Sequence, residues 1–184
     1  MSVPSTPSGP ERVIELRRTF GQAFAAAPPV EGRPQDDLLA VRVGGDPYAI
    51  RQPEVAALLS DSQIARLPGS QAALLGLMGL RGALVPVYDL RLLLGYPRAP
   101  VPRWFLIAAA ARVALAFDRF EGHLRVAREA VSTDAAPRAG NQSPYVQQVV
   151  RTDELVRPII HLPSVLNQIA VLAHQRPGRK GGDS

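Results

Sequence analysis

Short apolar runs separated by turn residues occupy the middle of the chain. Residues 38–43 are apolar, Gly44 to Pro47 has turn chemistry, and residues 48–50 are extended, which predicts a hairpin. Residues 72–79 fit either a helical turn or a strand, and Pro86 favours an edge position for its strand. The remaining predicted strands are 54–59, 83–88, 104–107, 112–117, 120–126, 145–150 and 155–160.

Helical spacing appears in three places. Near the start, Val13, Leu16, Phe20 and Phe24 lie on one face of a predicted helix that either packs on the body or binds a partner. Residues 89–94 predict a short helix ended by Gly95. A longer helix begins near Pro163 and carries an apolar stripe formed by Leu162, Val165, Leu166, Ile169 and Leu172.

One segment repeats. Residues 81–90 align with residues 151–162, because both contain an arginine, a turn, a strand with an internal proline and the start of a helix. A period of about 70 residues exceeds a solenoid unit and predicts two tandem β modules, which would share a core because each is small. We place the modules at about 38–102 and 103–174.

The two ends differ in composition from the body. Residues 1–37 are rich in proline, which opposes regular structure, and are predicted to be a flexible extension around the short amphipathic helix. Residues 175–184 are predicted to be a disordered basic tail.

Charge and composition narrow the class of protein. The 184 residues carry a net charge of +5, with Lys180 as the only lysine among 21 basic residues. The arginines alternate with acids and aromatic residues are few, which leaves nucleic-acid binding as a remote alternative. There is no cysteine, apolar spanning segment or signal peptide, so we expect a cytoplasmic protein without direct membrane insertion.

The sequence contains no catalytic constellation. His123, His161 and His174 lack partners at metal-ligand spacing, so neither a metal nor another cofactor is expected. Asp118 and Glu121 form a carboxylate pair in principle, but their position between two strands favours solvated turn residues. We therefore expect a protein that is not an enzyme.

Residues 74–91 resemble the CheW family of bacterial chemotaxis coupling proteins. The specific stretch is Leu-Arg-Gly-Ala-Leu-Val-Pro-Val-Tyr-Asp-Leu-Arg, and weaker similarity covers about residues 38–172. The resemblance implies a mainly β fold of two five-stranded SH3-like barrels with short helices and a C-terminal helix. It also implies a non-enzymatic cytoplasmic adaptor at receptor arrays, controlling motility.

The family resemblance suggests partners and contact residues. The partners are the cytoplasmic tip of a methyl-accepting chemoreceptor, the regulatory domain of a CheA-type histidine kinase, and other CheW-like proteins. Arg81, Val55 and Leu58 match the kinase interface, with a structural Arg81–Asp89 salt bridge as the alternative role of Arg81. The receptor groove would be lined by Leu39, Val41, Val85, Val87, Trp104 and Leu106, for which plain core packing is the alternative.

Three positions depart from the family pattern. Gly79 replaces the usual asparagine, Ala57 replaces an acidic residue common in the kinase-facing strand, and His161 replaces a polar residue before the last helix. These changes leave open an accessory adaptor that binds the receptor, has lost kinase binding and modulates array output.

Overall fold

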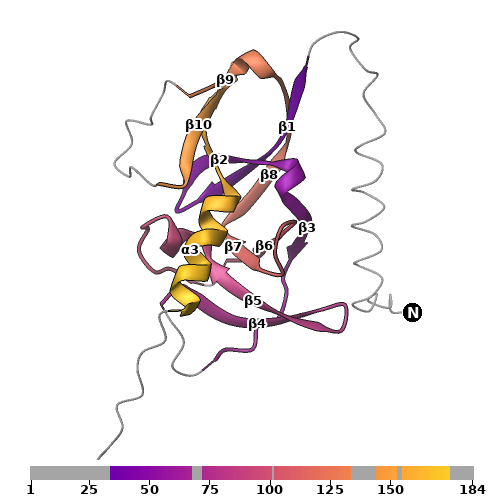
Figure 1. Ribbon diagram of the computed structural model, residues 1–184, viewed down its shortest axis with the longest axis vertical. Helices are drawn as coiled ribbons and strands as arrows, with labels where there is room; N and C mark the ends of the chain where they lie inside the picture. Colours follow the sequence, from indigo (N-terminus) through magenta and orange to yellow (C-terminus); the bar gives the residue numbers. More distant parts are fainter. Residues whose placement is uncertain (1–33, 68–71, 101, 134–143, 153–154, 175–184) are drawn as a thin grey trace, which may run out of the picture. The chain divides into compact units, whose positions relative to one another are not determined.

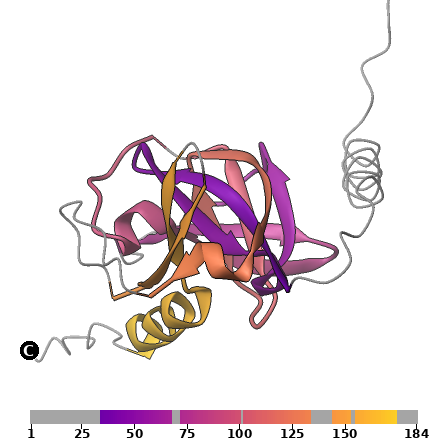
Figure 2. The same ribbon diagram turned by 90° about the horizontal axis from the view of Figure 1, so that it is seen from above.

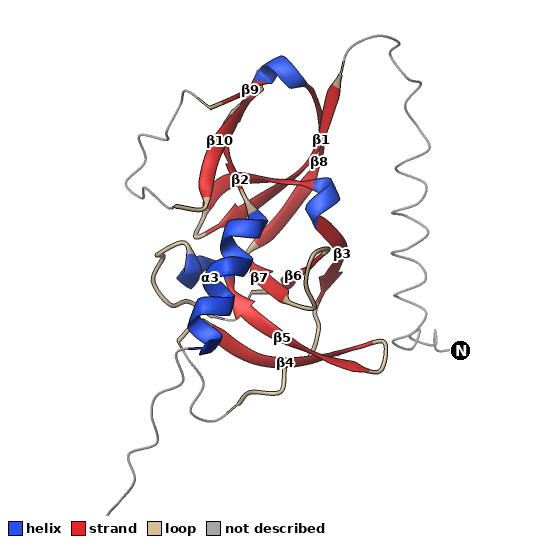
Figure 3. Ribbon diagram, viewed as in Figure 1, coloured by secondary structure: helices blue, strands red, loops and turns tan. Residues whose placement is uncertain are grey.

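The computed structural model describes residues 34–67, 72–100, 102–133, 144–152 and 155–174, and strands dominate them (Figure 3). The mainly β fold class is therefore confirmed. In chain order the elements are β1 (Gln35–Val43), β2 (Asp46–Arg51), the 3-10 turn η1 (Gln52–Glu54), β3 (Val55–Ser60), β4 (Leu74–Leu80), β5 (Ala83–Asp89), helix α2 (Leu90–Leu93), β6 (Trp104–Ala108), β7 (Ala114–Phe117), β8 (Arg119–Ala127), the 3-10 turn η2 (Arg128–Ala130), β9 (Val131–Ser132), β10 (Val146–Arg151), β11 (Val156–Ile160) and helix α3 (Leu162–His174).

The strands form two sheets (Figure 1). One has six strands in the order β8-β1-β2-β11-β10-β9, and the other has five in the order β3-β6-β7-β5-β4. An isolated bridge between Ala65 and Leu77 adds a further contact to the outer edge of β4. In the six-stranded sheet, the two-residue strand β9 pairs with the outer edge of β10.

The two sheets do not divide the chain at residue 102. The β1–β2 hairpin pairs with β8 and with β11, which come from the second half of the chain. The β6–β7 hairpin pairs with β3 and β5 of the first half. Each half therefore contributes one hairpin to the sheet that the other half completes, so the tandem boundaries predicted above do not coincide with the sheets.

The predicted repeat corresponds to two similar units. In each, an antiparallel hairpin leads into a helix, and its second strand pairs in parallel with the far hairpin: β5 with β7, and β11 with β2. The registers agree, because Leu77 pairs with Pro86 in one hairpin and Val149 pairs with Pro158 in the other.

Two local predictions need correction. The ambiguous segment 72–79 contains most of strand β4, and β5 lies inside its sheet rather than at an edge. Pro86 is tolerated there because β5 pairs with β7 only from Val87 onward. Pro86 pairs only with Leu77 of β4. Its lack of a backbone N–H therefore removes no hydrogen bond between β5 and β7.

Strand β1 begins earlier than the predicted boundary between residues 37 and 38. Gln35, Asp36 and Asp37 already pair with β8. Their polar side chains are compatible with a strand because Asp36 forms an ion pair with Arg51 at 3.1 Å and Asp37 pairs with Arg125 at 2.9 Å. The predicted N-terminal helix, like the tail at 175–184, lies outside the described residues.

Two apolar cores lie on the inner faces of the sheets. In the five-stranded sheet the core contains Met78, Val85, Val87, Phe105, Ile107, Ala114 and Ala116. In the six-stranded sheet it contains Leu38, Ala49, Val150 and Ile159. Leu39, Val41 and Leu106 point to the opposite faces by strand alternation and are also buried, so β1 and β6 are covered on both sides.

Helix α3 lies along one side of the strands (Figure 2). Its buried residues are Leu162, Val165 and Ile169, whose spacing of three and four places them on one helical face. None of the described helices is long and apolar enough to cross a membrane.

Candidate partner-binding site

Arg81 occupies the tip of the β4–β5 hairpin. Leu80 pairs with Ala83, so Arg81 and Gly82 form a two-residue turn, and both have positive φ angles, 49° and 78°. Such a turn matches the twist of the flanking strands and favours asparagine and glycine. Arginine in this conformation carries a strain of about 1–2 kcal/mol relative to ordinary backbone geometry. The turn therefore places the exposed side chain of Arg81 at the hairpin tip at a cost in backbone energy.

The alternative structural role of Arg81 is wrong. The carboxylate of Asp89 lies at the other end of β5 and is bonded to Arg91, with Nε–Oδ1 at 3.0 Å and NH2–Oδ2 at 2.8 Å. Within the part of the chain that the structure describes, Arg81 has no hydrogen-bond or ion-pair partner. Its guanidinium is available to another molecule.

Val55 and Leu58 lie on β3, an edge strand of the five-stranded sheet. Val55 is half-buried and pairs with Ala108, whereas Leu58 is buried opposite Leu106. The exposed position of this strand is Ala56. A partner at this edge would therefore touch backbone and small side chains more than the leucine.

Two of the three departures from the family pattern have structural explanations. Ala57 packs against the core of the five-stranded sheet, where an acidic side chain would be buried. His161 precedes α3, and its Nδ1 lies 2.8 Å from the hydroxyl of Ser164. Gly79 alone of the three is exposed at the hairpin.

Five of the six residues predicted to line a receptor groove are core residues. The side chains of Leu39, Val41, Val85, Val87 and Leu106 are all buried, with at most 3% of each residue exposed. A helix cannot contact them without repacking the sheets, so their assignment to an open groove is corrected to core packing. Trp104 is the exception, since it is half-buried.

Trp104 belongs to an aromatic cluster that the sequence did not reveal. Its ring centroid lies 5.6 Å from that of Phe120 and 6.5 Å from that of Phe117. Phe120 in turn meets His123 edge-on at 5.4 Å. The cluster connects β6 and β7 of one sheet with β8 of the other, whereas the residues are up to 19 positions apart in the sequence.

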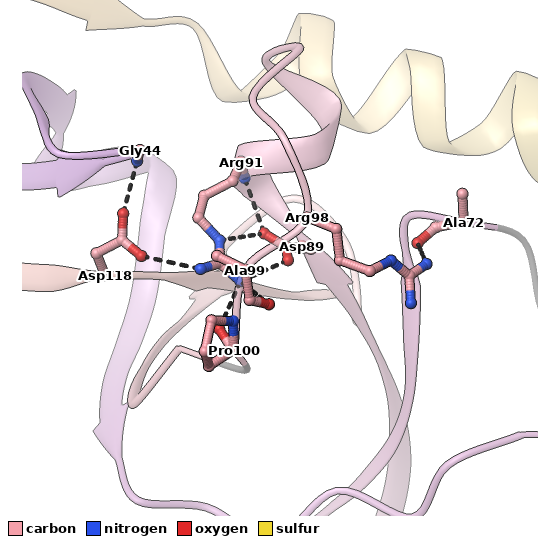
Figure 4. Close-up of polar contacts among 8 residues, drawn as sticks. All are labelled: Gly44, Ala72, Asp89, Arg91, Arg98, Ala99, Pro100 and Asp118. Atoms are coloured by element: carbon pink, nitrogen blue, oxygen red, sulfur yellow. Dashed lines mark hydrogen bonds and ion pairs between the residues drawn. The ribbon is translucent and has the colours of Figure 1, made fainter.

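A buried ion pair holds the base of the β4–β5 unit (Figure 4). Arg91 and Asp89 are only 4% and 1% exposed. Arg91 also lies 3.3 Å from Asp118 and donates to the carbonyl oxygen of Pro100 at 2.8 Å. The hydrogen bond to Asp89 raises the pKa of Arg91, although burial acts to lower it. This arginine therefore joins β5, the segment after α2 and the β7–β8 connection.

The same network reaches the β1–β2 turn. Asp118 accepts a hydrogen bond from the backbone N–H of Gly44 at 2.6 Å. The ring of Tyr96 lies against Gly44, where any Cβ atom would collide with it. Tyr96 also donates to Asp46 at 2.6 Å. Asp118 is thus a structural contact between the two sheets, and its predicted role as a solvated turn residue is wrong.

Glu121 also differs from the prediction. It pairs with Arg42 at 2.6 Å and with Arg157 at 2.7 Å. Burial acts to raise the pKa of Glu121, but the bonds from these arginines lower it below its ordinary value. Glu121 therefore offsets the charge of two arginines of the six-stranded sheet, Arg42 of β1 and Arg157 of β11.

The described residues contain no group of three or more His, Cys, Asp or Glu side chains that could hold a metal ion. The surface features described above are the tip of the β4–β5 hairpin, the edge of β3 and the half-buried rim at Trp104.

Comparisons with known proteins show the family of the chain. The profile of the CheW-like domain family matches residues 37–170. The Probable chemotaxis protein CheW of Rhizobium etli is 25% identical over 136 residues, which are 72% of this chain and 88% of that protein.

A solved structure gives the same fold. The crystal structure of the scaffolding protein TtCheW from Thermoanaerobacter tengcongensis superposes with a TM-score of 0.62 at 18% sequence identity. The match covers 69% of this chain and 89% of that one, and the two sheets are consistent with SH3-like barrels. The family is one of scaffolds rather than enzymes. Because the family profile spans most of the sequence, the chain belongs to the CheW-like domain family and is a CheW-like coupling protein of chemotaxis.

Proposed function

We propose that this chain is a cytoplasmic adaptor at receptor arrays. It binds the cytoplasmic tip of a methyl-accepting chemoreceptor and the regulatory domain of a CheA-type histidine kinase, and thereby controls motility. The observation that carries the kinase half is Arg81, which lies in a turn with positive φ and has no hydrogen-bond or ion-pair partner among the described residues. Contact with other CheW-like proteins of the same array belongs to this proposal.

For the receptor, the supporting surface is the half-buried rim at Trp104 and Phe120. A receptor tip is helical, and a helix places apolar side chains against such aromatic surfaces. The buried residues on either side would support this rim without touching the ligand.

An accessory adaptor that binds only the receptor is the second candidate. Its support is now Gly79, since Ala57 faces the core and His161 is bonded at the start of α3. Kinase binding by the full chain separates the two candidates.

The test measures binding of the full chain to two purified partners, the receptor tip and the kinase regulatory domain encoded by the same genome. Arg81→Asn keeps the positive-φ turn and removes the cation, and we expect kinase affinity to fall about thirtyfold with receptor affinity unchanged. Arg112→Asn, at another exposed arginine between strands, is the matched control.

Wild-type binding to the receptor tip but not to the kinase domain would select the accessory candidate. Binding to neither would refute both. Trp104→Ala should weaken the receptor complex and leave the kinase complex intact, which also shows that the variant is folded.

A further inference from the structure

The outer face of the β4–β5 hairpin carries an apolar surface with an open position. Leu84 pairs with Gly79, and the next pair on the same face is Leu77 with Pro86. Leu84 is 70% exposed, the largest value among the exposed large apolar residues of the described chain. A Cβ atom placed on Gly79 would meet no heavy atom within 4 Å. The leucine therefore stands beside an empty position on the sheet.

This surface is held rigidly from behind. On the inner face, Met78 and Val85 form a buried pair within the core of the sheet. The outer edge of β4 is bridged at Leu77, where Ala65 both donates and accepts a backbone hydrogen bond. A partner would therefore meet a preformed surface and would not have to order a flexible loop.

The equivalent hairpin shows that such a surface is not required by the fold. There the matching pair is Arg151 and Val156, so an arginine stands where Gly79 leaves the sheet bare. The inner pair also differs, because Val150 is opposite Arg157, which is ion-paired with Glu121. The difference between the two hairpins on this face therefore lies at one position, where Gly79 has no side chain and Arg151 has a long one.

We propose that Gly79 and Leu84 determine which kinase this adaptor binds. An aliphatic side chain of the kinase regulatory domain occupies the open position over Gly79 and packs against Leu84, while a carboxylate of the same domain pairs with Arg81. The inference rests on the proposed kinase binding and extends it to residues of the hairpin face. Arg81, which has no hydrogen-bond or ion-pair partner among the described residues, lies next to this apolar area and so favours an occupant with a carboxylate beside an aliphatic side chain.

The mechanism of selection is steric. A larger residue at position 79 would fill the space that the partner's side chain needs, and it would stand directly opposite Leu84. A kinase domain with a bulky contact residue would then fit this chain and be rejected by an adaptor that carries asparagine at the same position.

The experiment measures affinity of the full chain and its variants for the kinase regulatory domain by titration calorimetry. We expect Leu84→Ser to weaken binding about thirtyfold and Gly79→Asn about tenfold, with smaller loss for Gly79→Ala. Val171→Ser, at a 50% exposed valine on α3, is the matched control and should bind as the wild type does. Receptor-tip binding should not change in any of the four.

The outcomes separate this inference from the function on which it rests. If the wild type binds the kinase and Leu84→Ser or Gly79→Asn binds within twofold of it, the inference is overturned while the adaptor proposal stands. If the wild type does not bind the kinase, both fail. A dimer of the wild type that Leu84→Ser dissociates would assign the surface to a second copy and overturn the inference.

Discussion

The two hairpin–helix units share one plan and stabilise it in different ways. The β4–β5 unit ends in the four-residue helix α2 and is held by the buried Asp89–Arg91 pair. The β10–β11 unit ends in the 13-residue helix α3, whose first N–H is bonded by Glu54 at 3.0 Å. The first unit is fixed at its base by an ion pair, far from the hairpin tip. The second is fixed by a long apolar helix.

The largest expected effect is on the first unit. Arg91→Met leaves the buried Asp89 without a counter-charge, so we expect a loss of about 3–5 kcal/mol in the free energy of unfolding, measured by urea denaturation. Asp89→Leu combined with Arg91→Met should recover much of this loss. A single variant as stable as the wild type would show that the pair does not secure the unit.

The next prediction compares equivalent positions. Leu90 and Leu162 are the first residues of α2 and α3, and both are fully buried. Leu90→Ala and Leu162→Ala should each lower the free energy of unfolding by about 2–4 kcal/mol. The measurement is urea denaturation of both variants. A smaller loss for Leu90→Ala than for Leu162→Ala would show that the short helix contributes less to the core than the long one.

A smaller effect is expected at the start of α3. Glu54→Gln removes the negative charge next to the helix N-terminus and weakens the bond to the N–H of Leu162, with an expected loss of about 1 kcal/mol. Glu129→Gln, at an exposed acid in η2, is the control. Thermal unfolding of both variants measures the difference, and equal midpoints would contradict this role of Glu54.

The smallest effect concerns pH and the six-stranded sheet. Partial desolvation of the ring lowers the pKa of His123 below its ordinary value of 6.5, although the residue is exposed, and Asp37 offsets part of this shift. The folded protein therefore disfavours the protonated ring, and the contribution of His123 is present above about pH 6.5 and lost as the pH falls through the folded-state pKa. His123→Gln should flatten the pH dependence of stability between pH 7.5 and 5.5. A slope unchanged by this substitution would assign it to other groups.

Local signals in the sequence predicted most strands and both hairpin–helix units. Gly44 and Gly82 marked tight turns, and the repeated proline and leucine positions revealed the two units. The arginines of the repeat do not correspond, because Arg151 is equivalent to Gly79 and not to Arg81. The error at Leu39 and Val41 has a physical cause. Consecutive apolar residues in β1 indicate burial on both faces, so they could not also line an open groove.

Contacts between distant residues could not be predicted in this way. Asp118 and Gly44 are 74 positions apart, and neither has a local pattern that names the other. The Asp-Leu-Arg stretch was visible as a family feature, but the structure was needed to show that Asp89 pairs with Arg91 and that Arg81 has no such partner among the described residues. The sequence therefore singled out Arg81 and Gly79, but it could not show that Leu84 lies directly opposite Gly79.

The exchange of hairpins between the two halves has a consequence for synthesis. Strand β2 ends at Arg51, but its partner β11 ends at Ile160, 109 positions later. At ~5–20 residues per second, the first hairpin waits on the order of 5–20 s for the strand that completes its sheet. The nascent chain is therefore exposed to misassembly with other β-rich chains throughout that interval, and folding is complete only when the last strand has left the ribosome.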